Sequence, residues 1–102
     1  MSNINYKVVG QDGREISNTE HPLHPGYLIE MEIEARDLKK QDVALALGIK
    51  PHHLSELISE KRNVSAMLAI KLESVFGVDA NYWLRVQSSY DLIKARKKLQ
   101  LA

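Results

Sequence analysis

Two groups of side chains in the middle of the chain have the residue types that contact DNA. The first group is cationic and suited to backbone phosphates, which lysine and arginine bind most often; it comprises Lys39, Lys40, Lys50, Lys61 and Arg62. The second group is polar and suited to base edges, which its side chains can contact as hydrogen-bond donors or acceptors; it comprises Gln41, His52, His53, Ser55 and Glu56. The chemistry indicated is non-covalent recognition of a duplex.

The polar group has two weaknesses as a base-reading set. It lacks the arginine that most often reads guanine. Glu56 also repels phosphate unless a cytosine or an arginine lies opposite its carboxylate. The alternative interpretation, a solvated helix face, therefore stays open beside base contact.

The residues of both groups lie on or next to two short predicted helices. Apolar spacing predicts helices over Lys40–Leu47 and His52–Ser59, with Pro51 opening the second. Gly48 can end the first helix with a positive φ, and Ala44 is small where the two helices would cross. This is the pattern of a helix-turn-helix, whose second helix enters the major groove. A helical hairpin in any bundle would show similar spacing.

Apolar periodicity predicts three more helices around this pair. They cover Tyr27–Arg36, Ala66–Phe76 and Ala80 to about Leu99. Ser65 and Asp79 are plausible N-caps of the last two. The expected fold class is therefore all-α, a five-helix domain over residues 24–102.

The last predicted helix has an apolar stripe at helical spacing, formed by Trp83, Val86, Tyr90 and Ile93. The stripe either packs into the core or faces a second copy of the chain, since two-fold dimers are the commonest oligomers. Both interpretations stay open, and we expect the stripe to build core and dimer together.

Residues 1–23 are expected to form a small β-hairpin or arm and a linker. The Asp12-Gly13 pair is a turn signal between two short strand-like runs. A two-stranded hairpin is marginal in water by itself, so it either packs on the domain or remains an arm.

Composition excludes several classes of protein. The 102 residues suit one domain, and the absence of cysteine excludes disulfides and thiol nucleophiles. Neither a leader nor a long apolar run is present, so we expect a cytoplasmic protein with no membrane contact. No catalytic triad, paired carboxylate or phosphate loop has a supporting context, and His21 and His24 lack further ligands. We expect no enzyme activity, no cofactor and no metal.

The net charge of +1 hides a segregation of charge along the chain. Residues 1–37 are acidic, whereas residues 38–63 and 92–102 are basic. The acidic residues Glu30, Glu32, Glu34 and Asp37 are either a solvated helix face or a docking surface for a cationic protein. The basic tail is either a solvated helix end or a contact to DNA or a partner.

The run from His24 to Leu92 resembles the HigA-type antitoxins, a plasmid-maintenance branch of the Cro/CI-like helix-turn-helix proteins. The resemblance rests on His24-Pro25-Gly26, Val43-Ala44 with Gly48, Lys61-Arg62 followed by Val64-Ser65, and Ala69 with Leu72 and Phe76-Gly77. It rests above all on Trp83-Leu84, Gln87 and Tyr90-Asp91-Leu92.

The resemblance implies a dimeric antitoxin that neutralises a RelE-like mRNA-cleaving toxin from an adjacent gene. It also implies that the dimer binds double-stranded operator DNA and represses its own operon. Two alternatives stay open: an antitoxin that binds only its toxin, and a stand-alone phage-type repressor.

This chain departs from the family pattern at a few positions. Lys39-Lys40 stand where Ser-Gln is usual, and Lys50 stands where a capping serine is usual. Glu60 occupies a position that is commonly glycine. These changes concern DNA readout and leave the expected fold unaltered.

Overall fold

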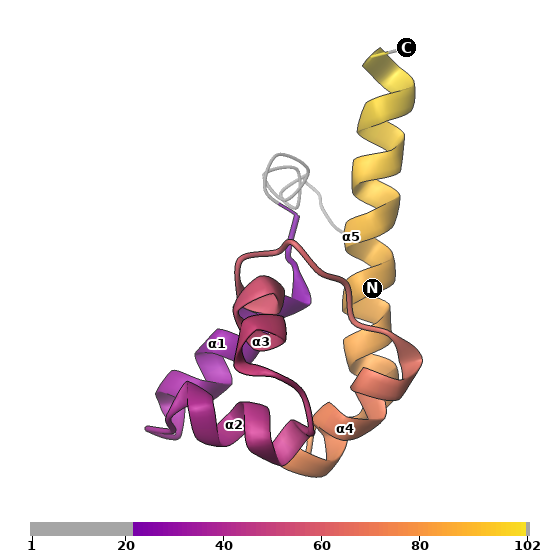
Figure 1. Ribbon diagram of the computed structural model, residues 1–102. Coiled ribbons are helices and arrows are strands. Elements are labelled where there is room, and N and C mark those ends of the chain that lie inside the picture. Colours follow the sequence, from indigo (N-terminus) through magenta and orange to yellow (C-terminus); the bar gives the residue numbers. More distant parts are fainter. Residues whose placement is uncertain (1–21, 102) are drawn as a thin grey trace.

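The computed structural model describes residues 22–101, and within them it contains five helices and no strand (Figure 1). The helices are α1 (Pro25–Ala35), α2 (Lys40–Leu47), α3 (Pro51–Ile58), α4 (Ala66–Phe76) and α5 (Ala80–Leu101). The all-α, five-helix prediction is confirmed, and the predicted bounds agree to within two residues. The expected N-terminal hairpin or arm lies outside the described residues except for its last two positions.

Side chains next to the helix starts satisfy N–H groups that the helices leave free. The Ser65 hydroxyl accepts a hydrogen bond from the N–H of Leu68 at 3.2 Å, and the Asp79 carboxylate accepts one from Asn81 at 2.7 Å. Both predicted N-caps are thereby confirmed. The first helix has a cap that we did not predict, because Nδ1 of His24 accepts from the N–H of Gly26 at 2.9 Å.

The core lies between α1, α2, α3 and α4 and is closed by the start of α5. Its fully buried side chains include Ile29, Leu47, Leu57, Leu72 and Trp83. The indole of Trp83 is 1% exposed, and its Nε1 donates to the carbonyl of Val78 at 3.2 Å. The first member of the predicted stripe is therefore a core residue.

Gly26 permits the close crossing of α1 and α3. A Cβ atom at this position would lie 1.8 Å from the carbonyl oxygen of Leu57, a separation that no side chain can occupy. Any larger residue would force the start of α1 away from the end of α3. The contact holds the inner side of α3 against α1. The opposite side of α3 therefore has a fixed direction, toward solvent.

The C-terminal half of α5 extends beyond the other four helices, whereas its N-terminal half packs against α4 and α1 (Figure 1). The remaining stripe residues, Val86, Tyr90 and Ile93, are half-buried. They line an open hollow of about 550 Å³ together with Leu23 and other residues of α5. An apolar surface is thus left on one side of α5.

Candidate nucleic-acid interface

The turn between α2 and α3 is tight and is built from the residues that the sequence indicated. Gly48 has φ 71°, a left-handed conformation that a side chain would strain. The N–H of Ile49 donates to the carbonyl of Ala44 at 3.0 Å, and Ala44 is fully buried. Leu54 and Leu57 anchor α3 in the core, so the opposite side of α3 faces solvent.

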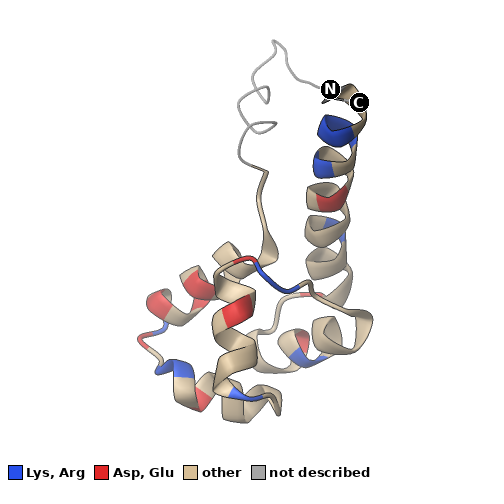
Figure 2. Cartoon of the chain, turned by 45° about the horizontal axis from the view of Figure 1, so that its top comes forward, with Lys and Arg blue, Asp and Glu red and all other residues tan. Residues whose placement is uncertain are grey.

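The five cations of the predicted phosphate-binding group are all exposed and surround α2 and α3 (Figure 2). Lys39 and Lys50 are the N-cap residues of the two helices, and neither side chain forms a capping hydrogen bond. Lys40 forms an ion pair with Glu30 of α1 at 3.6 Å. Its contact with a phosphate would require it to leave, or share, that carboxylate.

The residues predicted to face bases differ in exposure. Gln41 and Ser55 are exposed, and the His52 side chain is 81% exposed. His53 is half-buried, and burial lowers the pKa of its imidazole, with the Arg62 guanidinium adding to the effect. The neutral form of His53 is therefore favoured at neutral pH.

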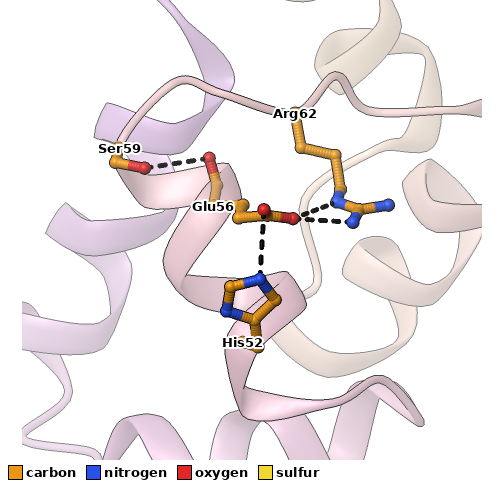
Figure 3. Close-up of polar contacts among 4 residues, drawn as sticks. All are labelled: His52, Glu56, Ser59 and Arg62. Carbon is orange, nitrogen blue, oxygen red and sulfur yellow. Dashed lines mark hydrogen bonds and ion pairs between the residues drawn. The ribbon is translucent and has the colours of Figure 1, made fainter.

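Glu56 lies between the side chains of His52 and Arg62 on the outer side of α3 (Figure 3). Nε and Nη2 of Arg62 both donate to Oε1 of Glu56, at 2.9 and 2.6 Å. Nε2 of His52 lies 3.2 Å from Oε2. The hydrogen bond from Arg62 is the main reason why the pKa of Glu56 lies below its usual range. The carboxylate that seemed to weaken the site thus has an arginine opposite it.

Gln87 connects α5 to the loop between α3 and α4. Its side-chain oxygen accepts from the N–H of Val64 at 2.7 Å, and its Nε2 donates to Asn63 at 3.2 Å and Asp91 at 3.1 Å. Only 6% of Gln87 is exposed. The sequence pattern included this glutamine but indicated no role for it. The available signal was its helical spacing from Trp83 and Tyr90, which predicts that Gln87 is buried with the stripe. A buried amide requires hydrogen-bond partners, so a structural role could have been expected.

His24 is a second buried polar residue whose position the sequence did not reveal. Its Nδ1 is occupied by Gly26, its Nε2 has no hydrogen-bond partner, and its ring lies edge-on to Tyr90 at 4.6 Å between centroids. Burial lowers its pKa, against the opposing charges of Glu60 and Asp91. Within residues 22–101, no three histidine or carboxylate side chains converge as a metal site would require.

Together, the tight turn, the anchored α3 and its exposed outer side define a helix-turn-helix protein. A family model described as helix-turn-helix matches residues 29–83. Virulence-associated protein I of Dichelobacter nodosus is 34% identical over 79 residues, which cover 76% of this chain and 73% of that protein.

Two solved structures resemble the chain throughout the helical domain. An addiction module antidote protein of a HigA family from Coxiella burnetii has a TM-score of 0.72 and 29% identity, covering 76% of this chain and 85% of that one. The Pseudomonas aeruginosa antitoxin HigA with higBA promoter has a TM-score of 0.72 and 30% identity, covering 76% and 86%. The chain belongs to the helix-turn-helix family and, within it, to the HigA-type antitoxins.

The family is one of regulators and antitoxins, which confirms the expectation that the chain is not an enzyme. In the part of the chain that the structure describes, no helix is both long and apolar enough to cross a membrane.

Proposed function

We propose that the chain is a dimeric antitoxin that represses its own operon by sequence-specific DNA binding and neutralises a RelE-like mRNA-cleaving toxin. The observation that carries the DNA-binding part is the surface around α3. An exposed helix, anchored from behind by Leu54 and Leu57, is bordered at both ends by cations that no core contact requires. A similar HigA structure has been determined with promoter DNA.

The cations would fix the position of the protein on the DNA backbone. Lys39 and Lys50 lie at the starts of α2 and α3, where free N–H groups and the helix dipoles also favour phosphate. Lys61 follows the end of α3 and completes this set, whereas Arg62, the fifth cation of the predicted group, is paired with Glu56. Gln41, His52, His53 and Ser55 would then face the bases, His53 to the smaller extent that its partial burial allows.

Dimerisation would use the apolar side of α5. Val86, Tyr90 and Ile93 line an open hollow on this helix, and filling it would remove apolar surface from water. A two-fold dimer would present two copies of α3 to successive major grooves, about 34–36 Å apart. Analytical ultracentrifugation tests this part: Val86→Glu should shift a dimer to monomer, and a monomeric wild type contradicts it.

The toxin-binding surface is proposed on the acidic side of α1. Glu34 is exposed, whereas Glu30 and Glu32 are half-buried and pair with Lys40 and Arg36. A ribonuclease toxin presents cationic surface to its RNA, which this side would attract. Reversing Glu30 and Glu34 to lysine should weaken binding to the product of the adjacent reading frame. Unchanged affinity in calorimetry would rule out this surface.

A gel-shift with DNA from upstream of the gene decides between the proposal and its alternatives. At about 50 mM salt we expect a discrete complex, and its affinity should fall steeply by about 200 mM as phosphate contacts are screened. No complex at low salt would leave only a protein-binding antitoxin. A complex without any toxin-like protein encoded next to the gene would indicate a stand-alone repressor.

A further inference from the structure

The Glu56–Arg62 pair leaves part of the arginine free. A guanidinium has five N–H donors. Two of them, on Nε and Nη2, are directed at Oε1 of Glu56. The donors that remain are on Nη1 and the second position of Nη2, and Figure 3 shows the outer nitrogen pointing away from the carboxylate. Arg62 therefore presents an open donor edge while its other edge is held.

This open edge lies on the outer side of α3, which faces solvent. His52 and Glu56 are four residues apart and share one side of the helix, opposite the buried Leu54 and Leu57. Arg62 comes from the following loop, and Glu56 attaches its guanidinium to that same side. The loop thereby supplies to α3 the arginine that its own sequence lacks.

We propose that Arg62 reads a guanine through this open edge and that Glu56 is the residue that positions it. The inference rests on the proposed DNA binding and assigns its sequence specificity. Two parallel N–H groups match O6 and N7 of guanine in the major groove. Glu56 does not touch the base in this arrangement, and its effect is transmitted through Arg62.

The charge of the pair argues against a phosphate contact for Arg62. Phosphate binding depends mainly on net positive charge, and the carboxylate of Glu56 cancels much of the charge of the arginine. Base reading depends on the direction of donors, which the two hydrogen bonds to Oε1 fix. Lys61, the adjacent cation, is exposed and suited to the phosphate role.

Selection of binding sites from a randomised duplex library tests the assignment, because the library covers every possible half-site sequence. The variants are Arg62→Lys, which keeps the charge but loses the donor fork, and Lys61→Ala as the phosphate-type control. Arg62→Lys should lose the preference for guanine at one position of each half-site by about tenfold, with the other positions unchanged. Lys61→Ala should weaken binding to all sequences alike.

Glu56→Gln separates positioning from a direct effect on DNA. In the wild-type background, we expect a reduced preference at the same guanine, because a neutral amide holds the guanidinium less firmly. In an Arg62→Ala background, the same change should leave base preference unaltered and raise the affinity for unrelated DNA, since a bare carboxylate repels phosphate. Loss of preference at a different base pair would show that Glu56 reads DNA itself and would overturn its positioning role.

Two other outcomes overturn the proposal in distinguishable ways. If Arg62→Lys selects the same sequences as wild type, Arg62 does not read guanine, although the protein still binds DNA specifically. If wild type itself enriches no sequence, the proposed function fails together with this inference. Thermal melting of each variant controls for folding, and we expect only a small shift for the Arg62 variants because the Arg62 side chain is exposed.

Discussion

The loop between α3 and α4 makes short polar contacts on two sides, one exposed and one buried. On the exposed side, Arg62 donates to Glu56 at 2.6 Å, and 46% of the Arg62 side chain is accessible. On the buried side, the N–H of Val64 donates to Gln87 at 2.7 Å inside the domain. The two contacts have nearly the same length and lie two residues apart.

Burial gives these contacts different effects on stability. An exposed ion pair contributes about 0–1 kcal/mol, because water and salt compete with it. Removing the partner of a buried N–H costs about 1–3 kcal/mol, because the group is left without any hydrogen bond. The buried side therefore holds the loop in place, and the exposed side is available to bind something else.

The largest effect should come from removing the core anchor of α5 on the buried side. Trp83→Ala should lower the free energy of unfolding by about 3–5 kcal/mol, through lost burial and the cavity left behind. Chemical denaturation followed by circular dichroism measures it. Leu99→Ala, at an exposed position of the same helix, is the control and should change stability by less than about 0.5 kcal/mol. Equal losses in both variants would contradict the burial of Trp83.

The buried contact itself can be broken with Gln87→Ala. We expect a loss of about 1–3 kcal/mol in the free energy of unfolding, since the N–H of Val64 would have no partner. Gln100→Ala removes the same side chain from an exposed position of α5 and should be neutral. If Gln87→Ala leaves the free energy of unfolding unchanged, a water molecule must accept the hydrogen bond from the N–H of Val64 equally well.

Glu60 lies at the start of the loop between α3 and α4, two residues before Arg62, and has φ 66°. A left-handed conformation costs a residue with a side chain about 1–2 kcal/mol, and glycine avoids most of that cost. Glu60→Gly should therefore stabilise the protein, by about 1 kcal/mol after the larger unfolded-state entropy of glycine is included. Asp79→Gly, which replaces a capping side chain, should not stabilise it. A lower melting temperature for Glu60→Gly would show that its charge matters more than its backbone.

Acidification should weaken the buried region by a smaller amount, because it removes no packing contact. The folded protein holds the pKa of His24 below its ordinary value of 6.5, so the unfolded chain takes up a proton first as the pH falls. The contribution of neutral His24 to the free energy of unfolding is therefore fully present above pH 6.5. It is lost progressively as the pH falls from 6.5 to the pKa of His24 in the folded protein. His53 acts in the same direction.

The slope of stability between about pH 7.5 and pH 5, measured by urea denaturation, checks this prediction. His24→Asn retains an N-cap acceptor for Gly26 but cannot titrate. It should show a shallower pH dependence than wild type. Identical slopes would assign the titration to other groups.

The smallest effect on stability should come from the exposed side. Arg62→Ala should change the free energy of unfolding by less than about 1 kcal/mol while it impairs DNA binding. Arg36→Ala is the matched control, because Arg36 also pairs with a glutamate but donates in addition to the carbonyl of Phe76 at 2.8 Å. It should cost more stability than Arg62→Ala. The reverse order would show that the Glu56–Arg62 pair holds the fold.

The helices and their ends were predictable because their determinants are local. Gly48 and the capping residues Ser65 and Asp79 act within a few positions of themselves. Apolar periodicity placed Leu54 and Leu57 toward the core, which left the other side of α3 outward. The roles of the exposed residues on that side follow from these positions only as proposals.

The contacts that organise the site depend on residues that are distant in the sequence or in different elements. Gln87 and Val64 are 23 positions apart, and no periodicity relates them. Arg62 was expected to bind phosphate, and its pairing with Glu56 required the path of the loop after α3. The sequence indicated His24 only as part of the His24-Pro25-Gly26 motif, and its burial against Tyr90 depends on where α5 passes.

The sequence by itself determined the five helices, the turn at Gly48 and the family, because propensity, capping and apolar spacing are short-range properties of the chain. Tertiary structure alone decided which polar groups meet and which are removed from water. It placed Gln87 inside the domain, where its hydrogen bonds stabilise the fold. It placed the Glu56–Arg62 pair on the surface, where an equally short contact remains exchangeable because water reaches it.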